Sequence, residues 1–161
     1  MPPLHRWGGR RGGVAKGSRR CGMGITLAQF WSLALAGCGG NANYFNIPMP
    51  DRLLISWVEN LFGIDASDFT FCIGESEVRH IFNRHGDPEQ ERRRGNIYVS
   101  VVDLELIPRI LSTFTDVRLG DRPQRLVITK QTDNLYFLVL EVSKKQRRIR
   151  LVTLYKKPIP V

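Results

Sequence analysis

Two histidines lie five positions apart in the segment Val78-Arg-His-Ile-Phe-Asn-Arg-His-Gly86. Imidazole is the side chain that gains and loses a proton near neutral pH, so His80 and His85 are candidates for a general acid and a general base. Ser76 before this segment and Gly86 at its end predict a helix over about residues 77–84. The chemistry therefore depends on which side of the helix each histidine occupies.

The two histidines fall on different sides of the predicted helix. At 100° per residue, His85 lies within an apolar stripe, whereas His80 lies on the wetter side with Arg84 and Glu77. We expect His85 to face a sheet from the last turn, where the helix dipole favours the imidazolium form and suits a general acid. Two alternatives stay open: His85 only caps the helix and His80 is solvated, or the last turn unwinds and both reach one substrate.

Polar side chains gather toward the ends of two predicted strands. Strict alternation along the last strand places Ile149, Leu151, Thr153 and Tyr155 on one face, which turns from apolar to polar. Glu141 similarly lies at the polar end of an otherwise apolar face of the preceding strand. Such a sheet end is suited to holding a phosphate, although strand ends are also polar simply because they are exposed.

Four cations are candidates for binding a substrate phosphate. Arg84 follows the histidines on the helix, and Arg94 ends a charged segment between about residues 87 and 95, which we expect to be a loop. Lys130 and Lys156 lie at the ends of predicted strands. The alternative for each is an ordinary solvated surface charge.

The predicted elements that must position these residues are mainly helices in the first part of the chain and strands in the last part. The predicted elements are a helix capped by Asp51 and ended by Gly63, a strand at about 69–73, the histidine helix, a helix interrupted by Pro108, and strands at about 126–130, 135–143 and 149–157. This order predicts the α+β class, with the N-terminal helices packed on one face of a roughly four-stranded antiparallel sheet.

The formal net charge is +9, but its distribution limits what it implies. Residues 1–50 hold six Lys and Arg and no acid, whereas the remainder holds eighteen bases against fifteen acids. Most of the excess therefore lies on a Gly- and Arg-rich leader and indicates little about the folded part. Cys21, Cys38 and Cys72 have no metal-type spacing, so we expect neither a stable metal nor another cofactor.

The composition of residues 1–48 predicts a basic, largely disordered leader, and we expect residues 49–161 to form the folded domain. Within the leader, the mostly apolar residues 25–36 and the sequence Leu35-Ala36-Gly37-Cys38 resemble a bacterial lipoprotein signal. In that interpretation Cys38 is lipidated and tethers the domain to a membrane. The alternatives are a chance match in a weakly apolar helix, or translation that begins at Met23 or Met49.

Four motifs occur in an order that resembles a known group of families. They are His80-Ile-Phe-Asn-Arg-His85-Gly86, Arg94-Gly95-Asn-Ile-Tyr-Val-Ser, Asp103 with Ile107-Pro108, and Thr153-Leu-Tyr155-Lys156. This set resembles the phage-associated Barnase–EndoU–colicin–RelE-like nuclease families, which share the BECR fold, over about Phe69 to Lys157. The resemblance implies helices packed on a four-stranded antiparallel sheet, with RNA lying across the sheet.

From this resemblance we expect a metal-independent endoribonuclease of phage or toxin type, which cleaves RNA by attack of the 2′-OH. The reaction needs a base for the 2′-OH, cations for the developing charge and an acid for the leaving oxygen. The candidates are His85, His80, Thr153, Tyr155 and Glu141 for catalysis, and Arg84, Lys130, Arg94 and Lys156 for substrate binding.

The alternative is a non-catalytic module of the same fold that binds RNA or protein, anchored to a membrane if Cys38 is lipidated. The expected partners are RNA and either a phage structural protein or an immunity protein. We expect a cytoplasmic location for a phage-encoded or phage-delivered protein, with a lipid-anchored envelope location as the other outcome.

Overall fold

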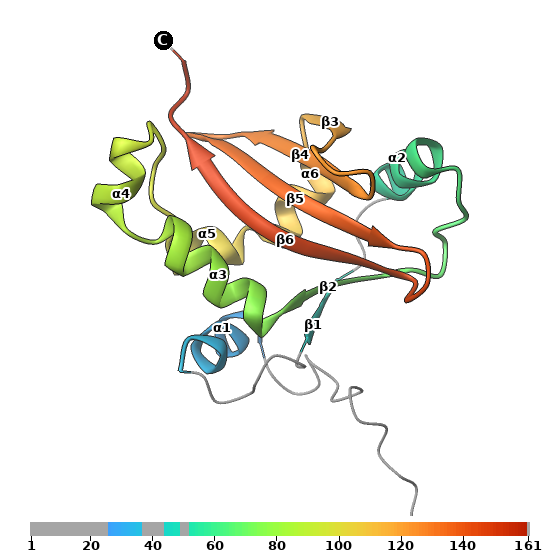
Figure 1. Cartoon of the computed structure of the whole chain (residues 1–161), viewed down its shortest axis with the longest axis horizontal. Coiled ribbons are helices and arrows are strands. Elements are labelled where there is room, and N and C mark those ends of the chain that lie inside the picture. The colour runs from blue at the N-terminus through green and yellow to red at the C-terminus, as the bar shows by residue number, and fades with distance from the viewer. Residues whose placement is uncertain (1–25, 37–43, 49–51, 161) are drawn as a thin grey trace, which may run out of the picture.

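The computed structural model describes residues 26–36, 44–48 and 52–160, so Cys38, Asp51 and the alternative start sites lie outside the described residues. The described chain is α+β, with one sheet whose strand order is β1-β2-β6-β5-β4-β3 (Figure 1). The strands are β1 (Tyr44–Ile47), β2 (Thr70–Gly74), β3 (Asp116–Leu119), β4 (Arg125–Gln131), β5 (Leu135–Ser143) and β6 (Arg148–Lys157). The helices are α1 (Leu27–Leu35), α2 (Arg52–Phe62), α3 (Glu75–His85), α4 (Pro88–Arg93), α5 (Val101–Glu105) and α6 (Ile107–Thr113).

The sheet corrects the expectation of four antiparallel strands, because it has six strands and is mixed within the described residues. β3, β4, β5 and β6 form the antiparallel part. β2 joins the other side of β6 in parallel, with Phe71 opposite Ile149, and β1 pairs antiparallel with β2. The parallel pair is possible because the helices and three strands between β2 and β6 form a long crossover connection.

One face of β4, β5 and β6 packs on the helices and the other is open. Alternate residues of β5 are buried (Tyr136, Leu138, Leu140 and Val142), which places them in the core with α5 and α6 behind the sheet in Figure 1. α3 and α4 border the C-terminal half of β6, beyond the point where its pairing with β2 ends. The residues between the buried ones form the open face.

A β-bulge in β6 corrects the predicted alternation of that strand. Leu140 pairs with Leu151 and Val139 pairs with Thr153, so Val152 is an extra residue opposite this pair. A bulge inserts one residue and reverses the side-chain alternation beyond it. Leu151 is therefore buried in the core, whereas Thr153 follows Val139 onto the open face. Thr153 and Tyr155 therefore lie on the opposite face of the sheet from Ile149 and Leu151, and not on the same face as predicted.

Residues assigned to the leader take part in this fold. In α1, Phe30, Trp31 and Ala34 are fully or almost fully buried, and Thr26 caps the helix. Arg79 of α3 donates to the carbonyl of Ala34 at 3.2 Å. β1 extends the sheet in the same region. The folded region thus begins well before the expected boundary at residue 48.

Local turn chemistry accounts for several element ends. Gly63 ends α2 with φ +62°, a conformation that favours glycine, as its position predicts. Pro108 separates α5 from α6, as expected. The expected loop after Gly86 instead contains α4, which Asp87 caps by accepting from the Gln90 amide and which Pro88 begins. No helix of the described chain is long and apolar enough to cross a bilayer.

We predict that Trp31→Ala lowers the free energy of unfolding by about 3–5 kcal/mol, the usual effect of removing a large buried aromatic side chain. Leu33→Ala, on the half-exposed side of the same helix, should lower it by about 1 kcal/mol or less. Urea unfolding of the full chain measures both. Equal effects would show that α1 does not pack in the core.

Candidate functional site

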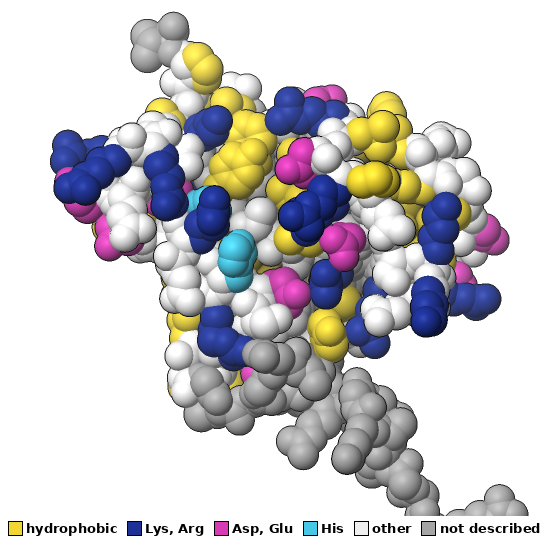
Figure 2. All heavy atoms as spheres, in the orientation of Figure 1, with side chains coloured by type: hydrophobic (Ala, Val, Ile, Leu, Met, Phe, Trp, Pro, Cys, Tyr) yellow, Lys and Arg dark blue, Asp and Glu magenta, His cyan; other side chains and the backbone are white. Residues whose placement is uncertain are grey.

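The open face of β5 and β6 holds most of the predicted site. Phe137 lies opposite Tyr155, and Val139 opposite Thr153. Glu141 lies opposite Arg150 where the face becomes charged. Figure 2 shows this face, with an apolar patch in its upper half, histidine beside the patch, and basic and acidic side chains interspersed around it.

His85 occupies the junction between α3 and this face. Its side chain is only 10% exposed, and its ring stacks on Tyr155 with 5.7 Å between ring centroids. Its Nδ1 lies 2.9 Å from Oε2 of Glu91, a fully buried carboxylate on α4. His85 therefore faces the sheet from the last turn of α3, as the helical geometry predicts.

Glu91 determines how the imidazole is oriented. Burial raises its pKa, but hydrogen bonds from His85, Arg94 and Asn96 outweigh burial and hold the pKa below its usual value. Glu91 is thus ionised near neutral pH, so Nδ1 of His85 carries a proton and donates it in this bond. The other nitrogen, Nε2, is left as the one available to a substrate.

Tyr155 links His85 to a second aromatic ring. Phe137 stacks on Tyr155 with 4.9 Å between centroids and 7° between ring planes. The ammonium of Lys157 lies 5.7 Å from the Phe137 centroid and 6.0 Å from that of Tyr155. Parallel rings beside a cation form a surface that suits a nucleobase as well as it suits a packed protein side chain.

His80 and Arg84 are exposed on α3, one and two turns after Glu77 on the same side of the helix. Glu77 reaches the sheet, because its Oε1 lies 3.4 Å from Nη1 of Arg150. The side of α3 that the sequence marks as the wetter one therefore borders the open face. His85 faces the open face, whereas His80 is exposed on the side of α3 that borders it, and the helix stays regular to His85.

Four charged side chains continue across the open face as a chain of ion pairs. Arg150 contacts Glu77 and also lies 2.9 Å from Oε1 of Glu141. The other oxygen of Glu141, Oε2, lies 3.2 Å from Nε of Arg125. Both oxygens of the candidate base are thus engaged by guanidinium groups, and the arginines are held on the face. Neither arginine was among the predicted substrate-binding residues.

The remaining predicted cations lie apart from the open face. Lys130 donates to the carbonyl of Thr113 at 2.5 Å, next to α6. Lys156 is buried beneath the sheet. Arg94 lies near the end of α3 but binds Oε1 of Glu91 at 2.7 Å and the carbonyl of Arg84 at 2.7 Å. The structure does not bring Lys130 or Lys156 together with the histidines, and Arg94 supports Glu91.

A second buried polar cluster lies on the helical side of β6. Asp103 accepts from the Tyr136 hydroxyl at 2.6 Å and from the Lys156 ammonium at 2.9 and 3.0 Å. Burial raises the pKa of Asp103, but bonds from the Ser100 amide, Tyr136 and Lys156 bring it below its usual value. Burial and the bond to Asp103 raise the pKa of Tyr136 above its usual range. This cluster stabilises the domain from behind the site.

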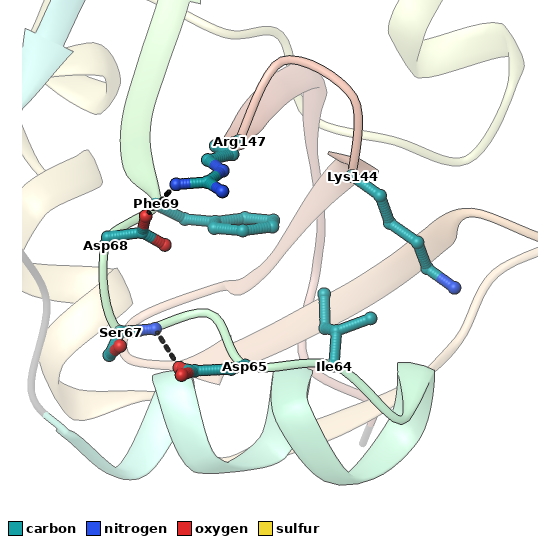
Figure 3. A pocket seen from close by; sticks show the side chains of 7 residues that line it. All are labelled: Ile64, Asp65, Ser67, Asp68, Phe69, Lys144 and Arg147. Carbon is teal, nitrogen blue, oxygen red and sulfur yellow. Dashed lines mark hydrogen bonds and ion pairs between the residues drawn. The ribbon is translucent and has the colours of Figure 1, made fainter.

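The hollows on the surface of the described chain include one on the open face and one at a distance from it. One, of about 580 Å³, lies on the open face next to Tyr155 and is lined by Arg118, Leu119, Gly120, Asp121, Arg125, Val127, Val139, Thr153 and Tyr155. The other, of about 430 Å³, lies between the segment after α2 and the β5–β6 turn (Figure 3). Its Arg147 and Asp68 pair with each other at 2.6 Å. Only the first adjoins the histidine site.

Within the described residues, no group of three or more His, Cys, Asp and Glu side chains is arranged to hold a metal ion. Cys72, the cysteine that the structure describes, is buried in the core.

Sequence reasoning missed Glu91, Arg125 and Arg150. Glu91 lies six residues after His85 in a charged segment for which the sequence predicts a loop. The Pro at position 88 after an Asp cap is a helix-start signal that would have placed Glu91 on a short helix. Arg125 and Arg150 follow from the strand register alone, as direct partners of Glu141.

Comparison with known proteins gives one family. The family model described as phage-Barnase-EndoU-ColicinE5/D-RelE like nuclease3 matches residues 53–159. No curated protein and no solved structure gives a significant match. The matched range includes His80, His85, Glu91, Glu141 and Tyr155, and it leaves out α1 and β1.

We predict that Glu91→Gln lowers the free energy of unfolding by about 2 kcal/mol, because hydrogen bonds to charged groups contribute about 1.5–3 kcal/mol. In ¹⁵N spectra, the wild-type neutral imidazole of His85 should carry its proton mainly on Nδ1, and this preference over Nε2 should weaken in Glu91→Gln. Glu89→Gln, an exposed carboxylate on the same helix, should change stability by about 0.5 kcal/mol or less and leave the spectrum unchanged. Identical behaviour of the two variants would contradict the pairing.

A second prediction concerns acid stability. Because the pKa of Asp103 is lowered in the folded state, its contribution is present above its unfolded value and is lost as pH falls through the folded value. Asp103→Asn should lower stability by about 3–5 kcal/mol at pH 7, since it leaves Lys156 buried without its partner. It should also lose less further stability than wild type below about pH 4, as measured by urea unfolding at several pH values. Parallel pH curves for the two proteins would refute this assignment.

Proposed function

Because the chain belongs to the phage-Barnase-EndoU-ColicinE5/D-RelE like nuclease3 family, we propose that it is an endoribonuclease that acts without a metal ion. The family supports a nuclease. The observation that carries the finer proposal is the imidazole of His85, oriented by a buried carboxylate and stacked on Tyr155 at the open face of the sheet. An oriented imidazole at a face that also carries arginines has the components of acid–base cleavage of a phosphodiester.

In the proposed reaction the 2′-oxygen attacks the adjacent phosphorus while a base removes its proton. The bond from phosphorus to the 5′-oxygen of the next nucleotide breaks, and that oxygen takes a proton from Nε2 of His85. The products are a 2′,3′-cyclic phosphate and a 5′-hydroxyl. The bond from Nδ1 to Glu91 holds the ring so that Nε2 is the nitrogen left for this role.

We assign the base to His80, with Glu141 as the alternative. His80 is exposed, and the side of α3 on which it lies borders the open face through the contact of Glu77 with Arg150. Glu141 lies on the face itself, but both of its oxygens already accept from arginines. It can act as a base only if a substrate phosphate replaces it at one guanidinium, and this makes His80 the simpler choice.

The charge that develops on the phosphate oxygens needs cations. Arg150 and Arg125 lie on the open face, and Arg84 lies on the exposed side of α3. The Tyr155 hydroxyl and the Thr153 hydroxyl are further donors on β6. Lys130 and Lys156 have no part in the proposal, because their ammonium groups bind Thr113 and Asp103.

The test uses the full chain, a labelled single-stranded RNA and EDTA. We expect cleavage that leaves cyclic phosphate ends and that is abolished by a 2′-deoxy substitution at the cut position. His85→Ala should lower kcat/KM by about 10²–10⁴-fold, the usual range for a general acid or base. Arg109→Ala, an exposed change on the helical side, serves as the control for charge.

The same assay separates the two bases. A large loss of kcat in His80→Ala with a modest change in Glu141→Gln supports His80, and the reverse result supports Glu141. Full activity of folded His85→Ala would remove the assignment on which the mechanism depends. RNA binding without cleavage by wild type would identify a non-catalytic binding module instead.

A further inference from the structure

We propose that the hollow beside Tyr155 is a nucleotide subsite, which binds one base of single-stranded RNA next to the phosphate that is cleaved. The proposal rests on the proposed function and adds to it the residues that select the substrate. The hollow lies between the β3–β4 connection and the open face, and its volume is about 580 Å³. Small-molecule sites occupy about 300–1,000 Å³, so a nucleotide fits this space.

Its position connects it to the histidine site through one side chain. Tyr155 lines the hollow and also stacks on His85. A base in the hollow would therefore be separated from the imidazole by the Tyr155 side chain. Occupancy of the hollow would position the strand and so influence which phosphate meets His85.

The lining combines an apolar floor with a charged rim. Val127 and Val139 are direct partners in the β4–β5 ladder and line the hollow with the ring of Tyr155. Arg118 is exposed on β3 opposite Val127, and Arg125 is held in place by Glu141. A flat base can lie on the apolar floor while its phosphate meets the guanidinium of Arg118.

Asp121 argues for a base rather than for a phosphate alone. Its carboxylate is exposed among the lining residues. A carboxylate repels a bare phosphate, whereas it accepts hydrogen bonds from the N–H groups on the edge of a base. Side chains of both signs over an apolar floor fit a ligand that carries donors, acceptors and an apolar face.

Thr153 supplies the most specific observation. Its Oγ1 is buried and has no hydrogen-bond partner among the described residues, although buried hydroxyls are almost always paired. Thr153 lines the hollow, and rotation of χ1 by one staggered step can move its hydroxyl to the position that its methyl group now holds. We assign this hydroxyl to the edge of the bound base, which would pair it.

The experiment measures binding without cleavage, by fluorescence anisotropy of labelled 2′-O-methyl hexaribonucleotides on the full chain. These probes lack the attacking hydroxyl, and four sequences rich in A, C, G or U report base preference. Arg118→Ala should raise Kd about tenfold for every probe and lower the salt dependence by about one phosphate contact. Arg122→Ala, an exposed arginine of the same connection outside the lining, should raise Kd less than about twofold.

Thr153→Val should change the order of affinity among the four probes, because it removes the hydroxyl and keeps the shape. Thr153→Ser retains the hydroxyl and should keep the wild-type order. Thermal unfolding checks that each variant is folded. Equal effects of Arg118→Ala and Arg122→Ala, together with an unchanged order in Thr153→Val, would overturn the subsite.

The two proposals fail in different ways. Wild type that binds the probes with these variant effects, yet does not cut ordinary RNA, would refute the nuclease and keep the subsite. Wild type that cuts RNA while the Arg118 and Thr153 variants bind all four probes as wild type does would keep the nuclease and refute the subsite.

Discussion

The buried carboxylate of Glu91 is the constraint on which the site depends. A buried charge is tolerated only when it is paired and hydrogen-bonded, and here the partners come from three segments: His85 ends α3, Arg94 follows α4, and Asn96 begins the segment that returns to the sheet. The Asn96 amide also donates to the Glu91 carbonyl. Satisfying one carboxylate thus fixes the end of α3, the start of the return segment and the plane of the imidazole together.

The return segment then transmits this constraint to β6. The Ile97 amide donates to the Lys156 carbonyl at 2.9 Å, and the Val99 amide donates to the His85 carbonyl at 2.7 Å. Alternation in β6 sends Tyr155 to the open face and Lys156 to Asp103 behind it. Tyr155 and Lys156 are therefore neighbours in one strand: Tyr155 stacks on His85 on the open face, and Lys156 pairs with Asp103 behind the sheet.

The parts of the fold that depend on local signals could be predicted, and those that depend on distant pairing could not. Gly63 and Pro108 act through their own backbone geometry, and helical spacing gave the direction of His85. The extra residue at Val152 has no local signal, because a bulge is defined by its partner strand. Glu91 looked solvated for the same reason: its charge is typical of a surface until its partners are known. α1 was assigned to the leader because its apolar residues also fit a signal segment, and only packing distinguishes the two.

The chain of ion pairs across the open face fits a site that must hold an anion. Free arginine side chains lose considerable conformational freedom when they bind a phosphate, and part of that loss has already occurred in Arg125 and Arg150. Glu141 holds one on each side, and Glu77 holds the second from α3. The carboxylates of Glu77 and Glu141 also offset the charges of the two arginines, which weakens the repulsion between them. Under the proposed function, an arriving phosphate would compete with Glu141 for guanidinium groups that are already in position. In the alternative in which Glu141 is the base, the release of its carboxylate beside the substrate would couple binding to the first proton transfer.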